Sequence, residues 1–252
     1  MPFVECATGA KLHYEQWNAE AVGIPVVVLH GMLGTATVDL EETNQYIANL
    51  GFHVIAPTLR GYGESTPKPR NFPMRFYERD ADDVMAFLDA LDIQKAHLIG
   101  YSDGGEIALL CAGKFPNRWA SAACWGAVGY FGEGMRLVAQ NPRVIAGDHI
   151  EEWEVELHGI DRKTFGRDWV RSIVNYIDTG GDVSLSFAPN IQCPLLLMLG
   201  ETDRLNPREF ADIYLQKVGH GTLEMFAGGH ACHTEQTEPF RRVLSAFLLG
   251  AR

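Results

Sequence analysis

The stretch Gly100-Tyr101-Ser102-Asp103-Gly104-Gly105 decides how the rest of this chain is interpreted, because it joins an apolar, strand-like run to an apolar, helix-like one. A serine between two glycines at a strand-to-helix turn is typical of a nucleophile elbow, a tight turn that lifts the hydroxyl clear of the backbone. Only glycine, two residues before and two after the serine, leaves room for such a turn. On its own the Gly-x-Ser-x-Gly pattern is weak, since a glycine-rich loop can hold a serine incidentally. Its meaning depends on the rest of the chain.

Length and composition are those of an ordinary globular protein. The chain has 252 residues, enough for one α/β domain or two small ones, and 46% of them are hydrophobic. The formal net charge is −11, which argues against nucleic acid as a partner because phosphate binding needs a basic face. An acidic surface can attract cationic small molecules, and it also serves solubility.

Cysteine usage and apolar runs bear on where the protein is located. The five cysteines show no Cys-x-x-Cys spacing and three lie in or beside apolar runs, so we expect reduced, buried thiols. The first residues lack a basic region followed by an apolar core, and no apolar run reaches the length of about 18 residues that suggests a membrane helix. We therefore expect a cytoplasmic protein with no membrane partner, as a monomer or a small homo-oligomer.

The chain alternates between strand-like and helix-like segments. Segments 3–6 and 11–17 alternate in polarity and are joined by Thr8-Gly9, which predicts an antiparallel hairpin. Continuous apolar runs, as expected of strands buried on both faces of a parallel sheet, follow at 26–29, 52–56, 97–99, 120–125, 195–199 and 223–226. Helical patterning falls between most of them, at 41–50, 77–91, 106–114, 208–217 and 239–249. This predicts an α/β fold with a mostly parallel sheet of about eight strands and helices on both faces.

One interval breaks the alternation. Between Trp125 and Cys193 there is no buried-strand run, and helical patterning occurs at 148–157 and 162–177. We interpret residues 129–188 as a helical cap inserted into a core made of residues 1–128 and 189–252. Open α/β sheets bind ligands beyond the carboxyl ends of their strands, so the cap is expected to dock there. A separate domain is the alternative, but no flexible linker rich in Ser, Gly or Pro brackets the interval.

A serine nucleophile needs a base and an orienting acid, and the chain offers both at the same sheet edge. The predicted strand 195–199 runs into Gly200-Glu201-Thr202-Asp203, and the next strand is followed by Gly228-Gly229-His230. The order Ser102, Asp203, His230 is that of α/β hydrolases and differs from the two other common serine-protease orders. Taken singly, Asp203 could cap a helix and His230 could be an ordinary loop histidine. The order of all three favours a catalytic triad.

The first predicted buried strand leads into His30-Gly31-Met32-Leu33-Gly34, a candidate oxyanion hole. Gly31 and Gly34 would let the backbone approach a bound substrate carbonyl, and the Met32 amide would point at it. The second donor is expected to be the amide of Asp103, the residue after the nucleophile. A plain strand-to-helix turn is the alternative for this segment.

Two other motifs are weaker. Arg60-Gly61-Tyr62-Gly63-Glu64-Ser65 superficially suggests a dinucleotide loop, but it lacks the third glycine and begins with an arginine, so we expect no nucleotide cofactor. His230 and His233 are three residues apart, with His220 upstream, which is weak support for a metal without a glutamate in the HExxH arrangement. We expect neither metal nor cofactor.

With those residues placed, the sequence resembles the α/β-hydrolase family across essentially its whole length, through HGMLG, RGYGES, GYSDGG, GETD and GGH. More narrowly it resembles the biphenyl hydrolase-like group, which includes valacyclovir hydrolase and cleaves α-amino acid esters. The similarity is densest at 30–34, 60–65, 71–84 (NFPMRFYERDADDV) and 100–105. The resemblance implies Ser102 as nucleophile, Asp203 as acid, His230 as base and Asp103 as the residue that recognises the substrate's α-ammonium group.

The role of Asp103 also has a physical argument. A carboxylate next to the nucleophile lies where the α-substituent of a scissile ester must lie, and charge pairing there favours an ammonium group. The alternative is that Asp103 only opens a helix, where an acidic side chain interacts favourably with the helix dipole. The family usually has an Asp two residues before Arg60, where this chain has Thr58. The cap resembles the group loosely, and four of its aromatic residues either line a pocket or form the cap's own core: Trp153, Phe165, Trp169 and Tyr176.

The sequence therefore predicts a cofactor-independent serine hydrolase of small carboxylic esters, with an α-amino acid ester as its small-molecule partner. Its predicted site comprises Ser102, Asp203 and His230, the Met32 and Asp103 amides, and Asp103 and Gly31 as substrate-binding residues. Enol-lactone or carbon–carbon bond hydrolysis on the same scaffold is one alternative, but it would need a carboxylate-binding pocket that Asp103 argues against. A non-catalytic small-ligand receptor that kept the fold is the other.

Overall fold

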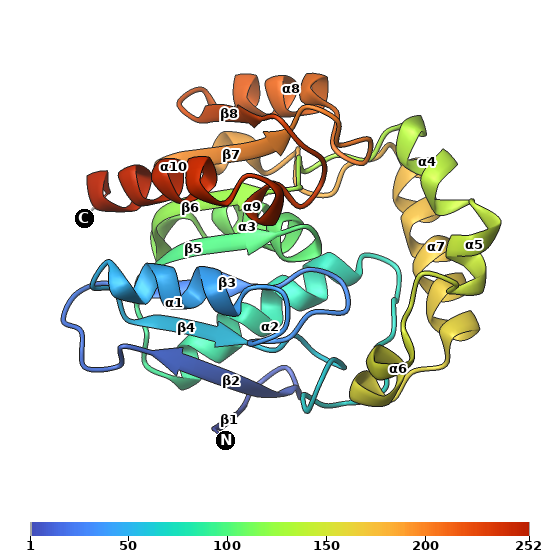
Figure 1. Ribbon diagram of the computed structural model, residues 1–252, viewed down its shortest axis with the longest axis horizontal. Helices are drawn as coiled ribbons and strands as arrows, with labels where there is room; N and C mark the ends of the chain where they lie inside the picture. The colour runs from blue at the N-terminus through green and yellow to red at the C-terminus, as the bar shows by residue number, and fades with distance from the viewer. Residues whose placement is uncertain (1, 252) are drawn as a thin grey trace.

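A computed structural model describes residues 2–251 and contains one eight-stranded sheet in the order β1-β2-β4-β3-β5-β6-β7-β8 (Figure 1). The predicted hairpin is present, because β1 (Phe3–Glu5) and β2 (Lys11–Trp17) pair antiparallel, and β2 also pairs antiparallel with β4 (Val54–Pro57). All other pairs are parallel. The remaining strands are β3 (Val26–Leu29), β5 (Ala96–Tyr101), β6 (Trp119–Trp125), β7 (Leu195–Gly200) and β8 (Thr222–Phe226).

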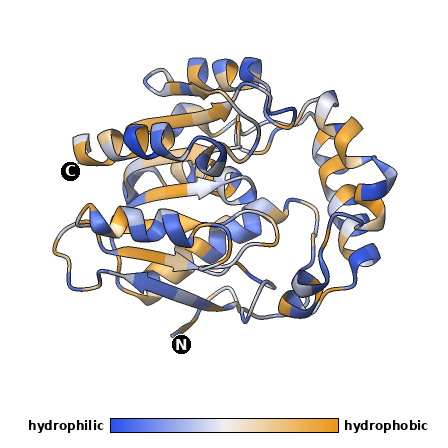
Figure 2. Ribbon diagram, in the orientation of Figure 1, coloured by the Kyte–Doolittle hydropathy of each residue, from blue (hydrophilic) through white to orange (hydrophobic). Residues whose placement is uncertain are grey.

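Helices cover both faces of the sheet, as predicted. Alternate residues of the strands belong to two different cores: Val27 and Leu29 pack with α2 and α3, whereas Val26 and Val28 pack with α1 and α10. Figure 2 shows the consequence for hydropathy, since β7 is hydrophobic along most of its length, whereas β2, next to the edge strand β1, is largely hydrophilic. The bounds of the core helices are α1 Glu41–Asn49, α2 Phe76–Ala90, α3 Asp103–Lys114, α8 Arg208–Val218, α9 Cys232–Glu235 and α10 Thr237–Gly250. Two short 3-10 turns are η1 Pro116–Arg118 and η2 Ala188–Asn190.

Four helices lie between β6 and β7, on the side of the sheet toward which the parallel strands point (Figure 1). They are α4 (Glu133–Ala139), α5 (Pro142–Ala146), α6 (Glu152–His158) and α7 (Arg162–Asp178). The predicted helix 148–157 is too long at its start, since α6 begins at Glu152, and the sequence did not predict α4 or α5. The placement of these helices agrees with a cap, and the exact domain division stays a prediction.

The cap aromatic residues differ in their surroundings. Phe165, Trp169 and Tyr176 are buried in the core that the cap shares with α2 and β3. Trp153 is 51% exposed and does not line the main cavity, so both predictions for that residue are wrong. Trp153 lies on the exposed side of its helix, α6, in which His158 is the buried residue.

Two general expectations can be compared with the structure. All five cysteines are buried and unpaired, as predicted. None of the helices in residues 2–251 combines the length and the apolar character that crossing a membrane requires.

Candidate active site

The turn at Ser102 has the predicted geometry. Ser102 lies between the end of β5 and the start of α3, with φ of 53° and ψ of −121°, a conformation that a non-glycine residue adopts only under strain. A Cβ on Gly100 would lie 2.2 Å from the carbonyl oxygen of Gly104, and one on Gly104 would lie 2.3 Å from that of Leu29. Both glycines are therefore required by backbone contacts, and the turn is a nucleophile elbow in form.

The structure brings Ser102, His230 and Asp203 into one hydrogen-bonded chain, although they come from three different strand ends. The Ser102 hydroxyl lies 2.9 Å from Nε2 of His230, and Nδ1 of His230 lies 2.9 Å from Oδ2 of Asp203. Because a carboxylate can only accept, Nδ1 of His230 carries the proton and Nε2 accepts from the serine. Nε2 of His230 is therefore oriented to take the proton of Ser102, as a general base must.

Asp203 is held as an anion by several donors. Its Oδ1 accepts from the Leu205 amide at 2.9 Å, and its Oδ2 accepts from the side-chain amide of Asn206 at 3.1 Å as well as from His230. Burial alone would raise the pKa of Asp203, but the hydrogen bond and charge of His230, with the two amides, bring it below its usual value. Asn206 also donates to the Gly126 carbonyl at 2.9 Å, which fixes its side chain. Sequence reasoning missed Asn206.

The loop that carries the predicted oxyanion amide of Met32 lies beside Ser102. A Cβ on Gly31 would be 3.2 Å from that of Ser102, so the loop 30–34 passes directly beside the serine. The Gly31 carbonyl, which shares a peptide group with the Met32 amide, accepts from Nδ1 of His30 at 2.7 Å and from the Gly34 amide at 3.2 Å. Within residues 2–251, neither the Met32 nor the Asp103 amide donates to another backbone group. Both remain available for a substrate oxygen.

Ser102 and His230 open onto a cavity of about 520 Å³, a size typical of small-molecule sites. Its lining includes three carboxylates, Asp39, Asp103 and Glu106, and no Lys or Arg from the described chain. The segment between β6 and β7 contributes apolar walls, made by Phe131, Met135, Val138, Val144 and Trp169. The cavity therefore combines an acidic interior with apolar walls.

Asp103 is the carboxylate nearest to the serine in sequence, and it is only 8% exposed. The Tyr77 hydroxyl of α2 donates to its Oδ1 at 2.6 Å, whereas its buried Oδ2 has no hydrogen-bond partner among the described residues. Burial raises the pKa of Asp103, and the Tyr77 hydrogen bond and the charge of Arg70 oppose that rise. When Asp103 is ionised, its Oδ2 therefore has no hydrogen-bond donor among the described residues. Tyr77 lies in the segment of densest family resemblance, but nothing in the sequence alone indicated its contact.

Glu106 is a second buried carboxylate on the same helix. It accepts hydrogen bonds from the amides of Val128 and Gly129, both at 3.0 Å, and so fixes the loop that leads from β6 toward α4. Burial raises the pKa of Glu106 to about 8. Nothing in the sequence indicated this role, because the contact depends on how the loop after β6 folds back onto α3.

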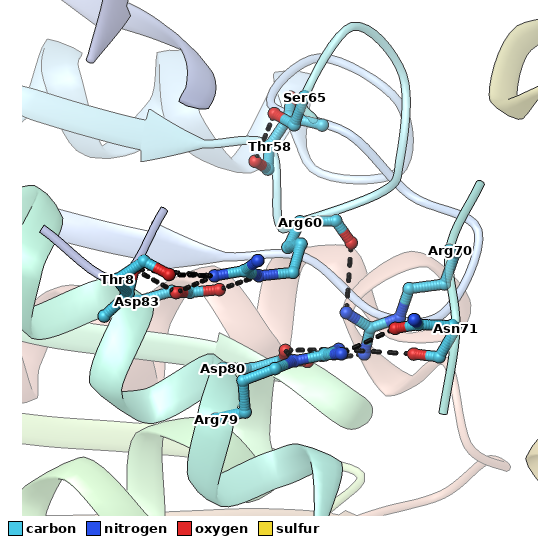
Figure 3. A network of polar contacts seen from close by, with 9 residues as sticks. All are labelled: Thr8, Thr58, Arg60, Ser65, Arg70, Asn71, Arg79, Asp80 and Asp83. Carbon is cyan, nitrogen blue, oxygen red and sulfur yellow. Dashed lines mark hydrogen bonds and ion pairs between the residues drawn. The ribbon is translucent and has the colours of Figure 1, made fainter. Parts of the chain in front are cut away.

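The segment 60–65 is tied to α2 by ion pairs (Figure 3). Arg60 binds both carboxylate oxygens of Asp83 at 2.6 Å, and the buried Arg70 binds Asp80 at 2.5 Å and donates to the Arg60 carbonyl at 3.0 Å. This gives RGYGES a structural role beside the site. Thr58 replaces the family's usual Asp and accepts from the Ala36 amide at 3.0 Å.

The histidines considered for a metal lie in different surroundings. Nδ1 of His233 accepts a hydrogen bond from the Trp125 indole at 3.0 Å, and His220 lies against the Cys193 carbonyl at 3.1 Å. In the part of the chain that the structure describes, no three His, Cys, Asp or Glu side chains gather as metal ligands would.

Comparisons with known proteins agree with this architecture. A family model described as alpha/beta hydrolase fold matches residues 24–143. The serine hydrolase BPHL of Mus musculus is 34% identical over 251 residues, which cover 95% of this chain and 84% of that protein. The Homo sapiens protein of the same name is 30% identical over 250 residues, with the same 95% and 84% coverage.

The fold of this chain also resembles that of a solved structure along nearly its whole length. The enol-lactonase from Burkholderia xenovorans LB400 matches with a TM-score of 0.73 over 98% of this chain and 100% of that one, at 21% identity. Such a distant match concerns the fold and not the substrate. The predicted resemblance is confirmed by the two nearer relatives, which cover nearly the whole chain. The protein therefore belongs to the α/β-hydrolase family and is a serine hydrolase related to BPHL, the biphenyl hydrolase-like enzyme.

Proposed function

We propose that this protein is a cofactor-independent esterase that cleaves small α-amino acid esters through Ser102, His230 and Asp203. The observation that carries the proposal is the pairing of that hydrogen-bonded chain with a neighbouring carboxylate, Asp103, whose Oδ2 has no donor in the described structure. The three hydrogen-bonded residues would carry out ester hydrolysis, and the carboxylate would favour substrates that have a cationic group.

The reaction follows from the positions of the groups. His230 Nε2 takes the proton of Ser102, whose oxygen attacks the ester carbonyl carbon, and the Met32 and Asp103 amides stabilise the negative oxygen of the tetrahedral intermediate. The imidazolium then gives its proton to the leaving alcohol, and an acyl-enzyme remains on Ser102. Water activated by the same imidazole releases the acid. Asp203 keeps the proton on Nδ1 and stabilises the charged imidazole.

The substrate's α-ammonium group would compensate the charge of Asp103. Tyr77 already donates to Oδ1, whereas Oδ2 is enclosed and has no donor, so a cation beside this carboxylate would neutralise a buried charge that the described residues leave only partly compensated. An uncompensated carboxylate beside the oxyanion hole would repel the developing negative charge, so the cation assists both binding and catalysis. Gly31 lets the backbone of the oxyanion loop lie close enough to contact the same acyl group.

The two alternatives fit the cavity less well. An enol-lactone or carbon–carbon bond hydrolase that binds a carboxylate needs a cationic partner, and the described lining has three carboxylates and no Lys or Arg. A non-catalytic receptor has no use for a serine held in a strained conformation and aligned at 2.9 Å with an oriented imidazole.

Covalent labelling tests the reaction class. A fluorophosphonate probe should add one label to the folded protein at Ser102, and Ser102→Ala should abolish it. Intact-mass spectrometry followed by peptide mapping measures both results. A folded wild-type protein that stays unlabelled would support the receptor alternative.

A further inference from the structure

His233 lines the same cavity as the proposed triad, and the mechanism makes no use of it. Its Nδ1 accepts the indole N–H of Trp125 at 3.0 Å. Because an indole nitrogen only donates, Nδ1 of His233 carries no proton in this arrangement. Burial, with the nearby charge of His230, lowers the pKa of His233 to about 4, so the ring is neutral near pH 7. The single ring proton therefore resides on Nε2.

The Nε2–H group of His233 is an unused donor. Among the described residues it has no acceptor, and it is not one of the enclosed polar atoms that lack a partner. The residue is 7% exposed, and it lines the cavity. Its ring is held by tilted contacts with Tyr101 and Trp125 and an edge-to-face contact with Phe240, at centroid distances of 4.6, 5.4 and 6.1 Å. The ring that carries this donor is therefore held in place at the cavity wall.

His230 and His233 form neighbouring parts of one cavity wall. Both rings pack on the Tyr101 ring, at centroid distances of 5.4 and 4.6 Å, and the cavity lining continues through Ala231 and Thr234. In the proposed mechanism, His230 protonates the departing alcohol oxygen, so the alcohol must lie against this wall and not against Asp103.

We propose that the Nε2–H of His233 is a specificity-determining donor for the leaving alcohol, selecting esters whose alcohol carries an ether, hydroxyl or carbonyl oxygen near the ester bond. The inference rests on the proposed esterase function, because it uses the direction in which His230 releases the alcohol. It concerns the alcohol half of the ester, whereas Asp103 is proposed to bind the acyl half.

Two alanine esters that differ in one atom test this subsite. The 2-methoxyethyl ester has an ether oxygen where the n-butyl ester has a methylene, so only the former can accept from His233. His233→Asn keeps an oxygen for the Trp125 indole, and its shorter side chain withdraws the N–H donor from the position of Nε2. It should lower the ratio of kcat/KM, methoxyethyl over butyl, by about tenfold, the worth of one good hydrogen bond. Intrinsic reactivity of the two alcohols cancels when variant and wild type are compared.

Two further variants separate the donor from a general effect. His233→Gln places an amide N–H at the distance of the lost Nε2–H and should recover part of the methoxyethyl preference. His220→Asn, the same change at a histidine outside the cavity, should keep the wild-type ratio. An unchanged ratio in His233→Asn, with both esters still cleaved, would overturn the subsite and leave the esterase proposal intact.

Nitrogen-15 NMR of histidine-labelled wild-type protein provides a test independent of turnover. His233 should show its proton on Nε2, and a proton on Nδ1 would overturn the inference even if the variants failed to fold. If the wild-type protein instead cleaves neither ester and resists the fluorophosphonate, the proposed function itself fails.

Discussion

At the scale of single residues, the order of Ser102, Asp203 and His230 along the sequence predicted more of the site than the residues next to each of them did. Ser102, Asp203 and His230 each follow a predicted strand, and the carboxyl ends of parallel strands meet at one sheet edge. Their contact could therefore be expected without a structure. Tyr77 and Asn206 could not be found in this way. Their contacts depend on how α2 and the loop after β7 pack, and no periodicity or spacing in the sequence encodes that.

Gly104 provides a prediction about the elbow itself. Gly104→Ala would place a methyl group 2.3 Å from the Leu29 carbonyl oxygen, and backbone there cannot move without disturbing β3. We expect a loss of about 1–3 kcal/mol or more in the free energy of unfolding, together with reduced activity. Urea denaturation measures the first. Gly134→Ala is the matched control, because a Cβ at that helical position meets nothing within 4 Å, and equal losses in the two variants would contradict the steric explanation.

At the scale of elements, the strand positions were predicted well and the cap helices poorly. The prediction that every apolar run is buried on both faces is wrong for β8, an edge strand in which Thr222 and Glu224 are exposed. Runs such as Leu195–Gly200 are apolar throughout, and their short length favours a strand covered on both faces. The segments that form α4 and α5 are short, and most of α5 is not fully buried, so their apolar spacing carried little signal. The start of α3 at Asp103 and not at 106 was missed because Gly104 and Gly105 resemble loop residues. Tertiary contacts decide these boundaries.

One imidazole from α6 links the cap to the core. Nδ1 of His158 accepts from the Gly63 amide and Nε2 donates to the Leu33 carbonyl, both at 2.9 Å, next to the oxyanion loop. Burial lowers the pKa of His158 to about 4, and the charge of Lys68 adds to this effect. Protonation would remove the acceptor for Gly63.

This link makes folding stability dependent on pH. The pKa of His158 is lower in the folded state than its ordinary value of about 6.5, so between about pH 4 and 6.5 the unfolded chain binds more protons. The contribution is fully present above pH 6.5 and is lost as the pH falls toward 4. His158→Gln, an amide that does not titrate, should reduce the slope of unfolding free energy against pH in this window by at most about 1.4 kcal/mol per unit. Urea denaturation from pH 4 to 8 measures it. His30 and His233 leave a residual slope of the same sign, and a slope identical to that of wild type would contradict the prediction.

At the scale of the whole molecule, the motifs spread along the chain predicted the family, and the comparisons confirm it. The cavity could not be predicted, because its acidic interior and apolar walls come from segments far apart in the sequence, including Asp39, Glu106 and Trp169. The formal charge of −11 has the same sign as the Asp39 and Asp103 carboxylates of the cavity, whereas Glu106, whose pKa burial raises to about 8, is mostly protonated near pH 7. The net charge and the Asp39 and Asp103 carboxylates favour the approach of a cationic substrate.

The central claim is that Asp103 makes this serine hydrolase selective for α-amino acid esters. The most direct test is the KM of paired esters of one alcohol, with the α-amine either free or acetylated, for wild type and for Asp103→Asn. A charge-assisted hydrogen bond corresponds to roughly tenfold to a hundredfold, so the variant should raise KM by that factor for the free amine and much less for the acetylated ester. Asp39→Asn, at a cavity carboxylate that is exposed to solvent, should change the preference far less. Equal changes in KM for both esters in Asp103→Asn would contradict the account.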